Sequence, residues 1–290
     1  MFLRFLFAAC LLGGCAYDGS VELLLSPDAG RTGAGGQAGP HGVARERSMM
    51  VVRGEDSLRY AVFWPSNADG DLVDGPWPLV AGLGPGNATP DQLEWLPVRL
   101  ASRGAVVVMP RGAQDLVAPE EANLDLVVDL VRTRADDDGD RLGGAVEAGL
   151  ATALGLGGGA TVALGRWLRS PERFGRVIAL AGTPERGLDL SAGAGRSSLL
   201  LVGAQDAVTD AAAVQQAWEQ MPEPSRLARI DGMTFHRWLD EIPEAEMALE
   251  PQPDSSPEEA RDRSVQVMSL FMEGGLDEPD LPDLEGVVLE

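Results

Sequence analysis

Apolar residues recur between residues 49 and 272 in two patterns, short continuous runs and longer amphipathic stretches. Continuous apolar runs are typical of strands buried in a parallel sheet, and spacings of three and four residues are typical of helices that pack on a sheet. The runs predict strands over residues 49–53, 58–64, 77–81, 105–109, 150–154, 176–181, 198–202 and 226–230. The amphipathic stretches predict helices over residues 91–103, 120–134, 160–169, 210–221 and 258–272. This order predicts an α/β fold in one domain, with a doubly wound, mostly parallel sheet flanked by helices.

The two ends of the chain differ from this central pattern. Residues 15–47 are rich in glycine, so we expect a flexible tether there, and we expect His41 within it to be inert. Residues 273–290 are acidic and punctuated by proline, which predicts a disordered tail. The predicted domain therefore spans residues 48–272.

The first residues predict the compartment. Arg4 precedes an apolar run that is too short to cross a bilayer as a helix, so residues 1–14 are interpreted as a signal peptide. Residues 12–15, Leu-Gly-Gly-Cys, resemble the lipobox of bacterial lipoproteins, a family in which the cysteine, here Cys15, is acylated after cleavage. The resemblance implies a lipid anchor in the bacterial cell envelope, and Ala16 favours the outer membrane by the sorting rule of that family. The alternative is an ordinary secretory signal with a chance cysteine.

Composition excludes several kinds of site and partner. Cys10 lies in the predicted signal peptide and Cys15 is the predicted lipidation site, so the mature fold would have no disulfide, thiol nucleophile or cysteine-based zinc site. The net charge is −22 and all 23 basic residues are arginines, which argues against nucleic acid or anionic lipid as the main partner. We interpret the charge as a solvated acidic surface in a protein from an organism whose genome is biased toward Arg, Ala and Gly codons. We expect no cofactor.

Residues 151–161 have the form of a nucleophile elbow. A short apolar strand enters a G-x-G-x-G sequence and a helix of small residues follows. In the G-x-S-x-G motif, two glycines flank a strained strand-to-helix turn that exposes a seryl oxygen above a sheet. Here Gly155 and Gly159 are in place, but Gly157 stands at the nucleophile position. Glycine has no side chain and cannot form an acyl-enzyme, so hydrolysis by a seryl nucleophile is excluded at this position.

Five segments in a fixed order resemble the α/β-hydrolase superfamily, and in particular dienelactone hydrolases, cutinase-like polyester hydrolases and platelet-activating-factor acetylhydrolases. The segments are residues 78–84, 100–108, 151–161, 199–206 and 232–236, and the resemblance covers residues 49–272. It implies an α/β-hydrolase fold and a triad in the order nucleophile, acid, base. The sequence departs from the family at Gly157 and also at Ala81, where many relatives have a histidine before the glycine.

The resemblance implies roles for four more residues. Asp206 follows a predicted buried strand at the position of the family acid, and His236 follows the next strand at the position of the family base. His236 is also the only histidine outside the predicted tether, so any imidazole base must be His236. The backbone N–H groups of Leu83 and Gly158 correspond to the oxyanion hole. The alternatives are a histidine that only packs and an aspartate that only caps a turn.

An acidic turn precedes the predicted elbow strand. Residues 136–140, Asp-Asp-Asp-Gly-Asp, place carboxylates at alternating positions as in a calcium loop, but the glycine does not fall where an EF-hand loop needs it. We interpret this segment as a solvated turn and expect no metal site.

Together these features predict an envelope lipoprotein with a degenerate, non-catalytic esterase-like domain that binds a small molecule or another envelope protein. The alternative is an active hydrolase of ester-type substrates in which His236 and Asp206 activate a water in place of the seryl nucleophile. A third interpretation is a purely structural envelope protein.

Overall fold

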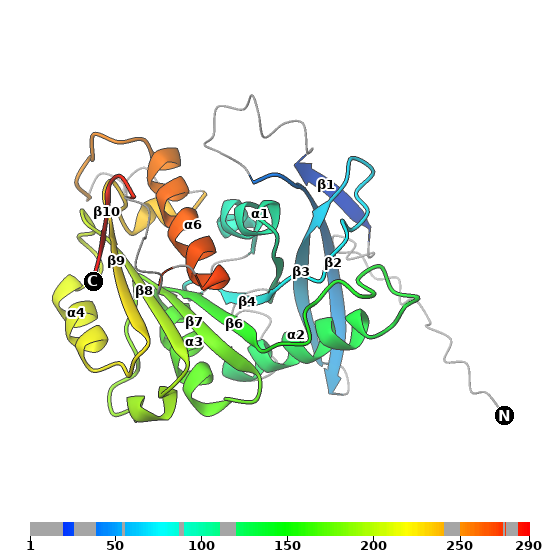
Figure 1. Cartoon of the computed structure of the whole chain (residues 1–290), viewed down its shortest axis with the longest axis horizontal. Helices are drawn as coiled ribbons and strands as arrows, with labels where there is room; N and C mark the ends of the chain where they lie inside the picture. Colours follow the sequence, from blue (N-terminus) through cyan, green and yellow to red (C-terminus); the bar gives the residue numbers. More distant parts are fainter. Residues whose placement is uncertain are drawn as a thin grey trace.

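The computed structural model describes residues 20–25, 39–53, 56–86, 90–110, 120–240, 250–274, 276 and 284–290 of the chain. The described part is an α/β structure built on one mixed sheet of ten strands, in the order β1-β2-β3-β5-β4-β6-β7-β8-β9-β10. Strands β5, β4, β6, β7, β8 and β9 run parallel to one another, and the pairs at both edges are antiparallel (Figure 1). The expected α/β class and mostly parallel, doubly wound arrangement agree with this sheet.

The strands are β1 Val21–Leu25, β2 Gly42–Arg53, β3 Asp56–Ser66, β4 Leu79–Leu83, β5 Val106–Pro110, β6 Ala151–Leu156, β7 Phe174–Leu180, β8 Ser197–Gly203, β9 Ser225–Ile230 and β10 Val287–Leu289. The α-helices of the described residues are α1 Trp95–Ser102, α2 Glu120–Ala135, α3 Gly158–Arg169, α4 Ala211–Glu219 and α6 Pro257–Glu273, and three short 3-10 helices are η2 Pro90–Leu93, η4 Leu190–Gly193 and η5 His236–Trp238. Each predicted helix has a counterpart within a few residues of its expected bounds.

The helices cover both faces of the sheet and form two hydrophobic layers. One layer contains apolar side chains of α2, α3 and α4, including Leu124, Leu164 and Val214. The other contains apolar side chains of α1 and α6, including Leu96 and Met268. Strand β6 contributes alternate residues to the two layers, as expected for a strand buried on both faces. The central strands are therefore continuous apolar runs in the sequence.

Helix α6 begins and ends at residues that explain its bounds. The side chain of Ser256 accepts a hydrogen bond from the N–H of Glu259, and the Glu259 carboxylate accepts one from the N–H of Ser256. This capping box, with Pro257 at the first helical position, satisfies N–H groups that have no partner within the helix. At the other end Gly274 adopts a φ of 81°, which ends the helix.

Three segments of the predicted tether and tail form strands of the sheet instead. Residues 21–25 and 42–47 of the expected tether lie in β1 and β2, and residues 287–289 of the expected disordered tail form β10 on the opposite edge of the sheet. His41 packs against the ring of Trp77, with 5.1 Å between ring centroids. Glycine content indicated flexible chain, but strand pairing with β2 and β9 stabilises short apolar segments that local composition does not distinguish from a linker.

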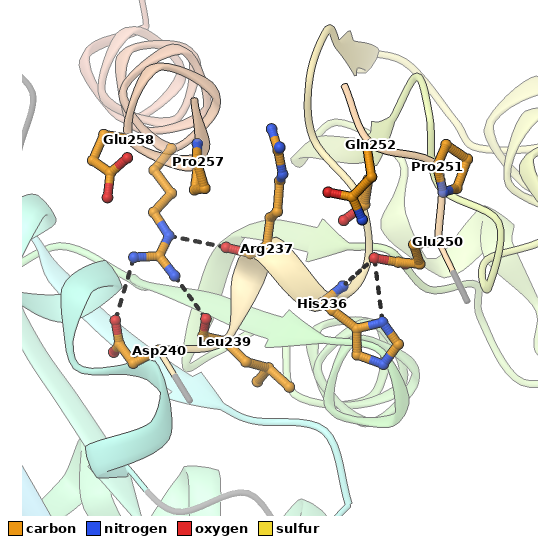
Figure 2. A pocket seen from close by; sticks show the side chains of 11 residues that line it. His236, Arg237, Leu239, Asp240, Glu250, Pro251, Gln252, Pro257 and Glu258 are labelled. Atoms are coloured by element: carbon orange, nitrogen blue, oxygen red, sulfur yellow. Dashed lines mark hydrogen bonds and ion pairs between the residues drawn. The ribbon is translucent and has the colours of Figure 1, made fainter. Parts of the chain in front are cut away.

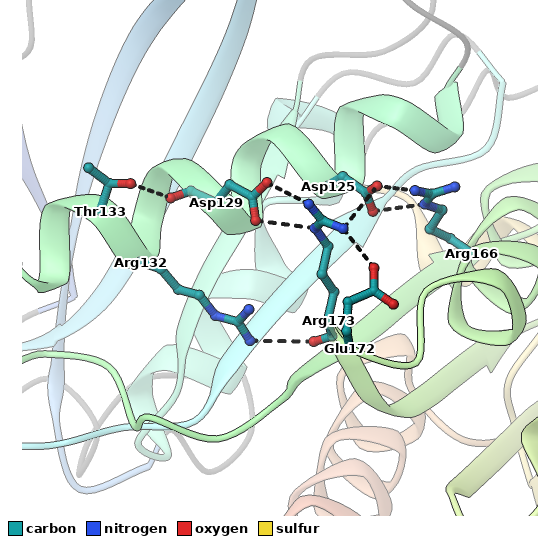
Figure 3. Close-up of polar contacts among 7 residues, drawn as sticks. All are labelled: Asp125, Asp129, Arg132, Thr133, Arg166, Glu172 and Arg173. Carbon is teal, nitrogen blue, oxygen red and sulfur yellow. Dashed lines mark hydrogen bonds and ion pairs between the residues drawn. The ribbon is translucent and has the colours of Figure 1, made fainter.

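Arginine–carboxylate contacts join helices α2 and α3 and the turn that follows α3. Figure 3 shows Arg166 of α3 against Asp125 of α2, and Arg173 between Asp125 and Asp129. The Nε of Arg166 lies 2.8 Å from Asp125 Oδ1, and Arg173 Nη2 lies 3.0 Å from Asp129 Oδ2. Several charges on partly exposed side chains share this network, so it fixes the helices more than an isolated surface ion pair would.

No helix among the described residues is long and apolar enough to span a membrane.

Candidate functional site

Gly157 forms a sharp turn between strand β6 and helix α3. Its φ is 56° and its ψ is −118°, a left-handed backbone conformation that residues with a side chain rarely adopt. The N–H of Gly157 donates to the carbonyl oxygen of Leu180 on the neighbouring strand, and the carbonyl of Gly157 accepts from the N–H of Ala160 in the first turn of α3. The strand-to-helix turn expected from the elbow sequence is therefore present, without a side chain at its tip.

The glycines around this turn are required by close backbone packing. A Cβ atom on Gly155 would lie 2.2 Å from the carbonyl oxygen of Gly159, and one on Gly159 would lie 2.6 Å from that of Leu83. A Cβ atom on Gly182, just after β7, would lie 2.5 Å from the carbonyl oxygen of Gly157. These distances leave no room for a side chain, so the ends of β4, β6 and β7 meet the start of α3 only because all three residues are glycine.

The space above Gly157 is bordered by two side chains. A Cβ atom on Gly157 would lie 3.3 Å from Cε2 and Cζ of Phe235 and 3.3 Å from Cβ of Pro85. These distances are tighter than ordinary carbon–carbon contact. The Cβ atom of a nucleophilic residue at position 157 would therefore lie against the ring of Phe235. The ring occupies part of the space that the absent side chain leaves above Gly157.

The two residues expected to supply oxyanion donors both lie next to this turn, since Leu83 pairs with Gly155 across the sheet and Gly158 follows Gly157. Leu83 is the last residue of β4 and is 8% exposed, and Gly158 is the first residue of α3. A Cβ atom on Gly158 would lie 3.9 Å from the backbone nitrogen of Gly86, so the loop after β4 passes in front of the helix start. N–H groups in the first turn of a helix have no partner within the helix and can bind an anion.

His236 contacts a buried carboxylate. Its Nδ1 lies 3.2 Å from Oε2 of Glu250, and its backbone N–H donates to the same oxygen at 3.3 Å. Figure 2 shows this edge of the imidazole facing Glu250, while the other ring nitrogen points away from it. The side chains are 12% and 4% exposed. The carboxylate therefore lies beside Nδ1, where the acid of a catalytic triad stands, at ion-pair distance but without the geometry of a hydrogen bond.

Asp206 makes a different set of contacts. Its Oδ1 accepts hydrogen bonds from the N–H groups of Val208 and Thr209, at 2.8 and 2.7 Å. Its Oδ2 is buried and has no hydrogen-bond partner among the residues that the structure describes. The contacts of Asp206 are those of a turn residue at the exit of β8, and the carboxylate beside His236 belongs to Glu250.

The structure nevertheless brings the predicted segments together at the carboxyl ends of the parallel strands. A Cβ atom on Gly203, at the end of β8, would lie 2.1 Å from the carbonyl oxygen of Met233, so the Asp206 turn abuts the segment that leads to His236. Phe235 lies over Gly157 and packs edge-on against His236, with 5.6 Å between ring centroids. In open α/β sheets, ligands bind outside the carboxyl ends of the strands.

A pocket of about 290 Å³ lies beside the His236–Glu250 pair. Figure 2 shows that its walls come from the η5 segment, residues 250–252 and the first turns of α6. Arg261 holds η5 in place, because Nε donates to the carbonyl of Arg237 at 2.9 Å and Nη2 to that of Leu239 at 2.6 Å. Burial lowers the pKa of Arg237 and of Arg261, although nearby carboxylates oppose this effect.

Sequence reasoning missed Glu250. It follows the histidine in the chain, whereas the family order places the acid before the base. The segment around it is rich in glutamate and proline, and no local pattern distinguishes Glu250 from its acidic neighbours. The only signal was the presence of several carboxylates within twenty residues of the sole candidate histidine.

The acidic turn at residues 136–140 uses its carboxylates for internal contacts. Asp137 Oδ1 accepts from the N–H of Gly139, and Asp140 accepts from Arg134 and from the N–H of Leu142. Within the described ranges, no group of three or more His, Cys, Asp or Glu residues is placed to hold a metal ion. The predicted signal peptide, Cys15 and Ala16 lie outside the described residues.

No protein-family model matches the chain, and no curated protein is significantly similar to it.

Proposed function

We propose that this chain is a lipoprotein of the bacterial envelope, anchored through Cys15, whose α/β-hydrolase-like domain binds a ligand or an envelope protein without catalysing a reaction. The observation behind this proposal is the turn at Gly157, where the backbone has the strained conformation of an elbow but Phe235 and Pro85 lie beside a position that has no side chain. Glycine supplies no nucleophile.

The position of Phe235 supports loss of catalysis more strongly than the sequence alone does. A seryl oxygen lies one bond beyond Cβ, and at Gly157 even Cβ would be 3.3 Å from two ring carbons of Phe235. A substrate carbonyl would have to approach that oxygen to within about 3–3.5 Å. The ring therefore obstructs the path that acyl transfer requires, and a restored serine would also need a smaller residue at position 235.

The pocket beside Glu250 supports a binding role. Its volume of about 290 Å³ is at the small end of the range for ligand sites, and its walls combine charged groups, of which Glu250 is buried, with apolar side chains such as Leu239. Several of these charged groups already make contacts, including Arg237, whose Nη1 donates to the carbonyls of Gly232 and Ser255. We expect a small polar ligand here.

A second candidate function rests on the contact between His236 and Glu250. A histidine beside a carboxylate can act as a general base towards water, so the chain would hydrolyse ester-type substrates slowly. In this version Glu250 replaces Asp206 as the acid, because Nδ1 of His236 lies 3.2 Å from Glu250.

Hydrolysis of short-chain p-nitrophenyl esters by the full chain separates the two candidates. We expect no activity above background in the parent, in Gly157→Ser or in Phe235→Ala, and activity with labelling by a serine-directed phosphonate in the double variant Gly157→Ser/Phe235→Ala. Turnover in the parent that His236→Ala abolishes would overturn the non-catalytic proposal and establish the second candidate. A folded double variant that neither hydrolyses ester nor reacts with the phosphonate would count against the elbow assignment.

A further inference from the structure

Strand β1 begins close to the proposed lipid anchor. Five residues, 16–20, separate Cys15 from Val21, the first residue of β1. An extended chain spans at most about 3.3–3.6 Å per residue, so Cys15 lies no further than about 22 Å from Val21. Because β1 is hydrogen-bonded to β2, this short connection limits how far the whole sheet can move from an anchored cysteine.

Strands β2 and β3 extend on the same side as that connection. β1 runs antiparallel to β2 with Val21 opposite Glu46, so β2 continues beyond the start of β1 as far as Arg53 (Figure 1). Seven further residues at about 3.3 Å each correspond to about 23 Å. The far end of this strand pair therefore reaches about as far from the start of β1 as Cys15 can.

The extended part of the strand pair has an unusual surface for this chain. Met49 and Val51 are 48% and 68% exposed, and they lie two residues apart on one face of β2. Arg47 precedes them on the same face, and Arg59 of β3 lies opposite Met49. We name these four residues, Arg47, Met49, Val51 and Arg59, the hairpin patch. The patch joins exposed apolar side chains to two arginines in a protein of net charge −22, and Nη1 of Arg47 lies 4.0 Å from Oε2 of Glu22 on β1.

We propose that the hairpin patch lies against the lipid headgroups of the membrane in which Cys15 is anchored. The inference rests on the proposed acylation of Cys15. Surfaces that combine arginine with apolar side chains bind at the headgroup boundary, and anionic lipids attract the arginines. The same lipids repel the acidic remainder of the protein, so a short anchor favours the orientation in which the patch faces the membrane.

Fluorescence quenching on the full-length acylated protein tests this orientation. A single-cysteine variant, Val51→Cys, is labelled with a fluorophore and reconstituted in vesicles of phosphatidylethanolamine and phosphatidylglycerol that contain a lipid-attached quencher. The matched control is Val288→Cys, because Val288 is 59% exposed and lies in β10 at the opposite edge of the sheet. We expect at least about twofold stronger quenching at position 51, since such surfaces enter about 5–10 Å into the headgroup boundary. The variant Arg47→Gln should reduce the difference.

Three outcomes would overturn the inference, and they are distinguishable. Equal quenching at positions 51 and 288 in acylated protein removes the hairpin patch and leaves the anchor intact. A fluorophore at position 51 that is shielded from aqueous iodide but not quenched by lipid means that a protein covers the patch. An amino-terminal peptide that mass spectrometry finds without acyl chains removes the anchor, and the patch proposal with it.

Discussion

The turn at Gly157 and the His236–Glu250 pair lie at the same edge of the sheet, but they are formed in different ways. The turn depends on backbone packing among Gly155, Gly157 and Gly159, which are close in sequence. The pair depends on one contact between side chains fourteen residues apart, and the segment between them, residues 241–249, lies outside the described ranges. The first kind of feature leaves a clear sequence pattern and the second leaves none.

Because of this difference, a glycine motif alone does not show which reaction, if any, the turn supports. The G-x-G-x-G sequence persists here because a Cβ atom at either outer glycine would overlap backbone atoms, whatever the middle residue does. Such a pattern therefore reports a packing requirement of the fold. The chemistry has to be judged from the side chains that surround the turn, above all Phe235 and the His236–Glu250 pair.

The largest expected loss of stability is at Gly159, one of the glycines on which the backbone packing of the turn depends. In Gly159→Ala, the new Cβ would lie 2.5 Å from the carbonyl oxygen of Gly84 and 2.6 Å from that of Leu83. Backbone atoms of β4 would have to move, so we expect a loss of at least about 3 kcal/mol in the free energy of unfolding, at the upper end for overpacking. The loss should occur although alanine favours a helix more than glycine does. Urea-induced unfolding measures it.

The control for this prediction is Gly149→Ala. A Cβ atom on Gly149 would meet nothing within 4 Å, and its φ is not in the left-handed region. We expect a change of no more than about 0.5 kcal/mol in the free energy of unfolding. Equal effects of the two substitutions would contradict the claim that packing against β4 selects glycine at position 159.

A smaller loss of stability is expected when the His236–Glu250 pair is removed. Glu250→Ala removes the buried oxygen that accepts the N–H of His236 and contacts its Nδ1. Leaving a buried donor without its partner costs about 1–3 kcal/mol, and urea-induced unfolding should show a loss of this size. Glu250→Gln keeps an oxygen of the same shape and should lose less. Wild-type stability in both variants would mean that the contact contributes nothing to the fold.

The sequence predicted the central strands, the helices and the strand-to-helix turn, because continuous apolar runs, helical spacing and closely spaced glycines are local signals. It also placed Asp206 after β8 and His236 after β9, where the structure has them. It did not predict β1 or β10, since short edge strands are stabilised by pairing with distant residues. It did not predict Glu250 for the same reason, because only the folded chain brings this carboxylate to His236.

The smallest expected change in stability identifies which acid serves His236. Asp206→Asn retains an oxygen that can accept from the N–H groups of Val208 and Thr209, so the free energy of unfolding should change by no more than about 0.5 kcal/mol. The imidazole NMR signals of His236 should stay in place in Asp206→Asn and move in Glu250→Gln, because only Glu250 contacts the ring among these two carboxylates. The reverse result would show that His236 pairs with Asp206 in solution and would restore the order of acid and base that the sequence suggested. A shift in both variants would mean that the two carboxylates share the histidine.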